Sequence, residues 1–140
     1  RAIELNPSDD LAFDMRGDAL LWLGRTEEAL AAVETAHRFN PVGRSAGGRF
    51  SRSLVYYTLR RYREALAVAD EALVRYPDTA FLHAMRAVSL AQLGDLEEAQ
   101  RAAGDVKRYD PYFRSAEFGS RFVKPQDMAH LQEGLHKAGL

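Results

Sequence analysis

The chain of 140 residues is 46% hydrophobic and 28% charged, a composition typical of a globular domain. Its 19 basic and 20 acidic side chains nearly cancel, so there is no broad electrostatic field to attract nucleic acid or an anionic membrane. The absence of cysteine excludes disulfides and thiolate metal sites, and no apolar run approaches the roughly 20 residues of a membrane-spanning helix.

Short amphipathic stretches follow one another along the chain and are predicted to be helices arranged in pairs. Gly24 and Gly94 suit the left-handed residue that ends a helix, and Asp95 with Glu98 has the spacing of an N-terminal cap. The first helices of the pairs are expected at about 9–23, 48–59 and 79–93, and the second helices at about 27–39, 62–75 and 96–109.

The chain also repeats itself at a regular interval. The phrase LGRTEEALAAVETAHRFNP at 23–41 returns as LGDLEEAQRAAGDVKRYDP at 93–111. A looser copy ends at 77, and the opening RAIELNP matches the end of another. The four phrase-ending prolines are spaced by 34, 36 and 34 residues, at Pro7, Pro41, Pro77 and Pro111. We expect part of a longer protein, divided into a repeat remnant at 1–7, repeats at 8–43, 44–78 and 79–113, and a C-terminal cap at 114–140.

Residues of matching size recur at matching places in the three units. The small residues are Gly17, Ser53 and Ala87 in the first helices, and Ala29, Ala65 and Ala99 in the second. Larger apolar residues recur at Leu20, Tyr56 and Leu90, and a set of smaller ones recurs at Ala36, Ala72 and Val106. This series resembles the tetratricopeptide repeat family over about residues 1–113. The resemblance implies an all-α fold, a right-handed α-solenoid of about three helical hairpins closed by an atypical terminal helix.

In such a solenoid the first helices line a concave face, which is the expected binding site for a peptide or protein. Phe50, Leu54, Tyr57 and Phe81 should form its apolar floor, and we expect Tyr57 to be the ring on which a ligand packs. Helical spacing predicts the whole lining as Leu11, Asp14, Asp18, Leu21, Trp22, Phe50, Leu54, Tyr57, Phe81, Ala84, Val88 and Ala91.

Two further interpretations of this face stay open. Asp14 and Asp18 favour a basic or amide-rich ligand end, or form a solvated polar edge. The apolar side chains receive a ligand, or they are covered by a preceding hairpin or by Phe118 and Phe122 of the tail. Some tetratricopeptide domains grip a chaperone's C-terminal carboxylate with a lysine, asparagine and arginine clamp. That ligand is not expected here, because the corresponding places hold Asp14, Asp18, Phe50, Leu54, Ala84 and Val88.

The arginines Arg16, Arg52 and Arg86 stand where the family usually has leucine, which predicts a row of outward-facing guanidinium groups. The four histidines include no pair four residues apart that would place two metal ligands on one helix face. No nucleophile, base and orienting group come together either. We therefore expect neither enzymatic activity nor a catalytic residue, cofactor or metal in this chain.

The final segment is predicted to form a short first helix at most, followed by a capping helix with Met128, Leu131 and Leu135 on one face. Its ending resembles that of bacterial signalling proteins in which tetratricopeptide repeats follow a class III adenylate or guanylate cyclase domain. The resemblance implies an accessory module of a larger protein, or alternatively a self-association element that forms a homodimer. The lack of cysteine fits a reducing compartment, so a cytoplasmic location is expected. The matching residues are Glu133, Gly134, Leu135, Lys137, Ala138, Gly139 and Leu140, and His136 departs from the pattern.

Overall fold

The computed structural model describes residues 9–43 and 45–140, and these residues form helices and no strands. The predicted all-α fold is confirmed, whereas the predicted repeat remnant at 1–7 lies outside the described residues. None of the described helices is long and apolar enough to cross a membrane. The elements are α1 (Asp9–Trp22), α2 (Thr26–Phe39), α3 (Ala46–Thr58), α4 (Tyr62–Arg75), α5 (Ala80–Gln92), α6 (Leu96–Tyr109), the short 3-10 helix η1 (Ser115–Glu117) and α7 (Pro125–Ala138).

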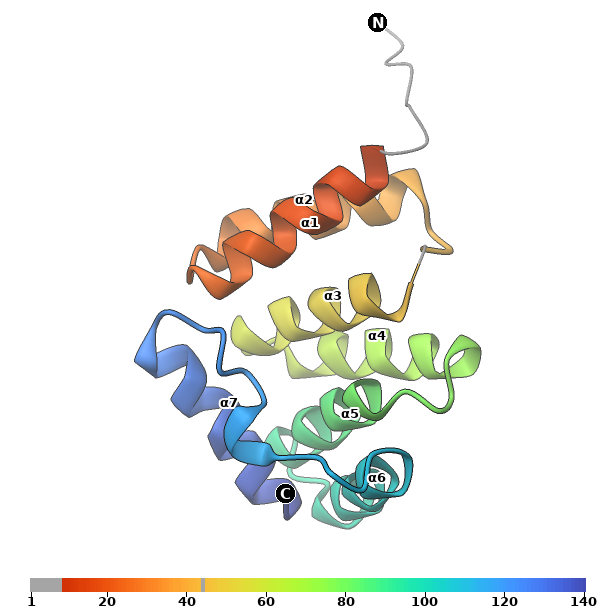
Figure 1. Ribbon diagram of the computed structural model, residues 1–140, viewed down its shortest axis with the longest axis vertical. Coiled ribbons are helices and arrows are strands. Elements are labelled where there is room, and N and C mark those ends of the chain that lie inside the picture. The colour runs from red at the N-terminus through yellow and green to blue at the C-terminus, as the bar shows by residue number, and fades with distance from the viewer. Residues whose placement is uncertain (1–8, 44) are drawn as a thin grey trace, which may run out of the picture.

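The first six helices form three hairpins that stack in chain order, and α7 lies along one side of the stack beside α3 and α5 (Figure 1). Each hairpin turns at a left-handed residue two positions after the last residue of its first helix. Gly24 has φ of 83° and Gly94 has φ of 87°, as their positions predict. The second hairpin has Arg60 at the equivalent place with φ of 63°, a conformation that is unfavourable for residues with a Cβ atom.

Small residues let the two helices of a hairpin approach closely. A Cβ atom added to Gly17 would lie 2.5 Å from Cγ1 of Val33, so only glycine fits between α1 and α2. In the second hairpin Ser53 and Ala65 are fully buried between α3 and α4. The Ser53 hydroxyl donates to the carbonyl oxygen of Ala65 at 2.8 Å, so the helices are in direct contact there. The predicted recurrence of small residues therefore marks the tight helix contacts.

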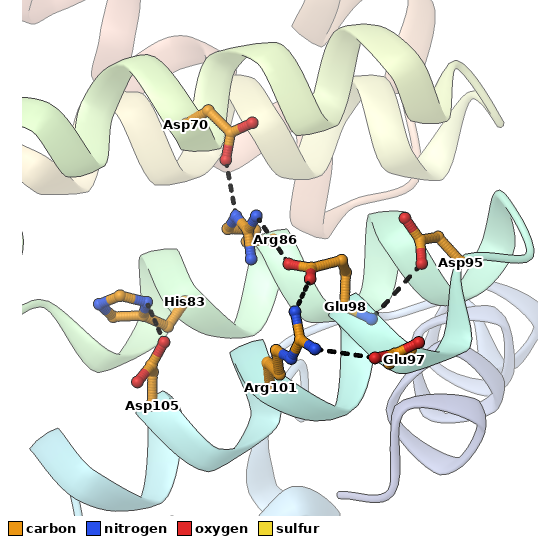
Figure 2. A network of polar contacts seen from close by, with 8 residues as sticks. All are labelled: Asp70, His83, Arg86, Asp95, Glu97, Glu98, Arg101 and Asp105. Carbon is orange, nitrogen blue, oxygen red and sulfur yellow. Dashed lines mark hydrogen bonds and ion pairs between the residues drawn. The ribbon is translucent and has the colours of Figure 1, made fainter.

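Ion pairs connect each hairpin to the one before it. Arg52 of α3 lies 3.0 Å from Glu34 of α2, and Arg86 of α5 lies 2.9 Å from Asp70 of α4. Figure 2 shows Arg86 between Asp70 and Glu98, so one guanidinium links three helices. This corrects the predicted outward row, because Arg52 and Arg86 are partly buried ties between hairpins. Arg16 on the first hairpin is exposed.

The tail after α6 contains a single turn of 3-10 helix and then α7, so its first half is less helical than a repeat. Pro125 opens α7, since a proline has no amide hydrogen to lose at the first helical position. Leu131 and Leu135 are buried, and Gly139 ends the helix with φ of 88°. The apolar face of α7 is thereby directed into the stack.

Candidate functional site: the open part of the concave groove

Helix α7 occupies the part of the concave face formed by the second and third hairpins. The Tyr57 hydroxyl donates to the backbone carbonyl of His130 at 2.9 Å, and the two rings stack with centroids 4.5 Å apart. The His130 Nε2 atom is 2.7 Å from the Tyr62 hydroxyl. Gly134 lies directly against Tyr57, because a Cβ there would be 2.2 Å from the tyrosine oxygen. The tail is therefore packed into the groove as closely as a core element.

The structure corrects the predicted extent of the accessible groove. Tyr57 is fully buried, and burial raises the pKa of its hydroxyl, so no ligand can pack on this ring while α7 is in place. The physical reason is that α7, the terminal helix of the same chain, packs on this part of the concave face and occupies the place of a ligand. Between 0% and 3% of the surface is exposed at six predicted lining residues, Leu21, Leu54, Tyr57, Ala84, Val88 and Ala91.

A short segment that precedes α7, residues 121–124, crosses to the end of α1 and is called the strap here. The backbone amide of Val123 donates to the carbonyl of Trp22 at 2.8 Å. The Phe122 ring meets the Trp22 ring edge-on at 4.7 Å, and the Arg121 guanidinium lies 5.1 Å from the centroid of the same ring. Trp22, predicted to line the groove, is thus largely covered by the strap.

Beside the strap a pocket of about 620 Å³ remains, called the open pocket here. It lies between α1, the start of α3, the start of α5 and the tail. Six of the predicted lining residues border it, namely Leu11, Asp14, Asp18, Trp22, Phe50 and Phe81. The remaining lining residues were not predicted from the sequence to belong to a site. They are Met15, Ser45, Gly47, Gly48, Ser51, Glu117, Phe118, Gly119, Ser120 and Arg121.

Three phenylalanines from different elements form the apolar wall of the open pocket. The Phe50 ring meets Phe81 edge-on at 5.1 Å and Phe118 edge-on at 5.7 Å, the geometry that aromatic pairs prefer. Leu11 and Met15 of α1 border the pocket from the other side, and 64% of Met15 is exposed. The pocket therefore offers an apolar surface that a side chain of another molecule could cover.

Two carboxylates of α1 line the same pocket and differ in their environment. Asp18 Oδ1 accepts from Trp22 Nε1 at 3.1 Å and from the Ser51 hydroxyl at 2.9 Å, and its other oxygen lies 3.7 Å from Arg121. Asp14 has no hydrogen bond or ion pair with any residue that the structure describes. Burial and the charges of Asp10 and Asp18 raise the pKa of Asp14, because nothing offsets the loss of solvation.

The remaining polar clusters have packing roles. His83 stacks on Tyr109 with ring centroids 5.2 Å apart, and its Nε2 lies 2.7 Å from the Pro77 carbonyl oxygen. Among residues 9–43 and 45–140, no group of three or more histidine, aspartate or glutamate side chains is placed to hold a metal ion. The open pocket is the candidate site because it combines a cavity, an apolar wall and an unpaired carboxylate.

Stacked helical hairpins with a pocket on the inner face define the α-solenoid class of proteins. The particular fold is that of tetratricopeptide repeat domains. The first such domain of Spaghetti (RPAP3), bound to the HSP90 peptide SRMEEVD, has a TM-score of 0.72 and 16% identity over 96% of this chain and 99% of that one.

Two other solved structures have the same arrangement. The second tetratricopeptide domain of human RPAP3, in complex with the HSP70 peptide SGPTIEEVD, has a TM-score of 0.67 and 18% identity over 90% of this chain and 94% of that one. The thermophilic protein TTC0263 of Thermus thermophilus has a TM-score of 0.67 and 20% identity over 92% of this chain and 72% of that one. No family model matches the sequence, and no curated protein matches it. At these identities the likeness defines the fold.

Proposed function

We propose that this chain is a non-catalytic protein-interaction module that holds a segment of a partner protein in the open pocket. The observation that carries the proposal is the cavity of about 620 Å³ whose wall is formed by Phe50, Phe81 and Phe118. Partly exposed aromatic side chains around a cavity are favoured anchors in interfaces. The peptide complexes of the two RPAP3 domains support the same use of this fold.

The test is a peptide-display selection on the 140-residue chain, followed by titration of the selected peptides. Met15→Gln replaces an apolar side chain that is 64% exposed at the edge of the pocket by a polar, uncharged one, so binding should weaken without a loss of folding. Val74→Gln is the matched control, because Val74 is 86% exposed on α4 and does not line the pocket. Peptides that bind both variants equally would contradict this placement of the site.

The larger context is part of the same proposal. On the resemblance of its ending, we infer that the chain is an accessory region of a larger bacterial signalling protein such as a nucleotide cyclase. Self-association is the alternative role. The structure also gives the terminal residues a packing role, since Gly134 and Leu135 pack into the groove. Light scattering separates the roles, because a concentration-independent mass near 15.7 kDa would contradict self-association of this chain.

A further inference from the structure

We propose that the open pocket selects a peptide segment in which an apolar side chain stands next to a lysine or arginine. The apolar side chain packs on the wall of Phe50, Phe81 and Phe118, and the cation pairs with Asp14. This inference rests on the proposed function and names the chemistry of the ligand that the same site would take.

The charges around the pocket favour a cation. The described lining contains three carboxylates, Asp14, Asp18 and Glu117, and one basic side chain, Arg121. Glu117 lies 3.0 Å from Arg114, and Asp18 is engaged by Arg121, Trp22 and Ser51 as described above. Asp14 is left as a partly buried carboxylate without a partner in the described part of the chain. A ligand ammonium or guanidinium would provide the charge-assisted hydrogen bonds that this carboxylate lacks.

The strap already displays this mode of binding within the chain. Arg121 and Phe122 are adjacent, and they contact the α1 side of the groove together. The Phe122 ring packs on Trp22 while the Arg121 guanidinium lies beside Asp18. Asp14 is one helical turn before Asp18 on α1 and borders the same cavity. A second pair of an apolar and a cationic residue, supplied by a partner, would therefore find a carboxylate and an aromatic wall arranged in a similar way.

The same charges disfavour the acidic peptides that the two RPAP3 domains bind. Both of those peptides end in EEVD, a sequence that carries several carboxylates. Here such a peptide would meet Asp14 and Asp18 and raise the energy of two carboxylates that already repel each other. Like charges brought together in an interface are a common source of selectivity. The expected ligand is thus opposite in charge to those peptides.

The first experiment reads the sequences of random displayed peptides selected on the wild-type protein. Enrichment of lysine or arginine next to leucine, phenylalanine or tryptophan is the expected result. Selected peptides that depend on Met15 but carry no basic preference, or an acidic one, would overturn the inference and leave the proposed function standing. A selection that yields no peptide sensitive to Met15→Gln would overturn both.

The second experiment titrates one selected peptide, labelled with fluorescein, against matched variants. Asp14→Asn should weaken binding about tenfold, and less at high salt, because one charge-assisted contact is lost. Asp78→Asn removes the same charge from the exposed loop before α5 and should leave the affinity unchanged. Replacing the basic residue of the peptide by glutamine should weaken binding to the wild type but have little further effect on Asp14→Asn. Equal affinity of the wild type and Asp14→Asn would overturn the inference.

Discussion

In each of the three hairpins a residue with left-handed backbone conformation follows the first helix. Only in the second hairpin is this residue not a glycine. Arg60 has φ of 63°, whereas Gly24 and Gly94 hold the equivalent places. The left-handed conformation destabilises a residue with a Cβ atom by about 1–2 kcal/mol. Replacement by glycine would remove this cost. Glycine has a greater chain entropy in the unfolded state, however, which offsets part of the gain.

Arg60→Gly should therefore raise the free energy of unfolding by about 0.5–1 kcal/mol, measured by urea denaturation. Gln100→Gly is the opposite control, because Gln100 is an exposed residue in the second turn of α6. Glycine at that position should lower the free energy of unfolding by about 1 kcal/mol. Changes of the same sign in both variants would contradict the account of the turn.

His130 makes the attachment of α7 sensitive to pH. Burial, with the charge of Arg60 as a second cause, lowers the pKa of His130 to about 4. The unfolded chain has a histidine pKa near 6.5, so between these values the unfolded state binds more protons. The stabilising contribution of neutral His130 is present in full above about pH 6.5 and is lost as the pH falls toward 4.

Between pH 7 and 4.5 the wild type should lose up to about 3 kcal/mol more of its free energy of unfolding than His130→Gln does. Urea denaturation across this pH range measures the difference between the two proteins, which removes the titration of the carboxylates they share. His136→Gln is the control, because His136 is exposed on the same helix and should follow the wild type. Parallel curves for all three proteins would contradict the role of His130.

At the scale of secondary-structure elements, α6 and α7 each contain a glycine that has a different neighbourhood. Gly134 faces Tyr57 and Val88, and a Cβ atom there would lie 2.2 Å from the tyrosine oxygen and 3.1 Å from the Val88 Cβ. Gly104 of α6 has nothing within 4 Å of the same added atom. Helix propensity favours alanine equally at both places, so packing alone separates them.

Gly134→Ala should lower the free energy of unfolding by about 1–3 kcal/mol, because the overpacked groove outweighs the better helix former. Gly104→Ala should raise it by about 0.5–1 kcal/mol. Thermal and urea denaturation of the pair provide the measurement. If both variants were stabilised, α7 would not be seated in the groove as described.

For the whole molecule, the tail is the element that connects hairpins that are not neighbours. The hairpins are otherwise tied in sequence, by Arg52 with Glu34 and by Arg86 with Asp70. Helix α7 packs on α3 and α5, while the strap reaches α1 through Phe122 and Trp22. In a linear stack each unit depends only on its neighbours, so such a bridge should increase the cooperativity of unfolding.

Phe122→Ala should weaken this bridge, because the ring is largely buried against Trp22. We expect a loss of about 2–4 kcal/mol and faster hydrogen exchange in α1, α2 and α7 than in α3 to α6. Tyr112→Ala, at a tail side chain that is 88% exposed, should change neither quantity. Uniformly faster exchange over all helices would argue against the strap as a separate bridge.

The sequence by itself determined the paired helices, the repeat period and the tight turns. These features depend on local chemistry, such as the left-handed glycines at 24 and 94 or the bond from the Glu98 amide to Asp95 at 3.4 Å. Close helix contacts were also predictable, because Gly17 and Ser53 recur at one place in the repeat. Helical spacing placed Asp14, Phe50 and Phe81 on the inner face for the same reason.

Only the tertiary structure decided which part of that face is accessible. The bond from Tyr57 to the carbonyl of His130 joins residues 73 apart in the chain, and no repeat pattern specifies such a contact. The sequence left open whether a ligand or the tail would cover Tyr57, since an apolar side chain is satisfied by either. Burial by α7 resolved that choice for Tyr57. The open pocket beside Asp14 stays accessible because no residue of α7 lines it, and the strap contributes only Arg121 to its border.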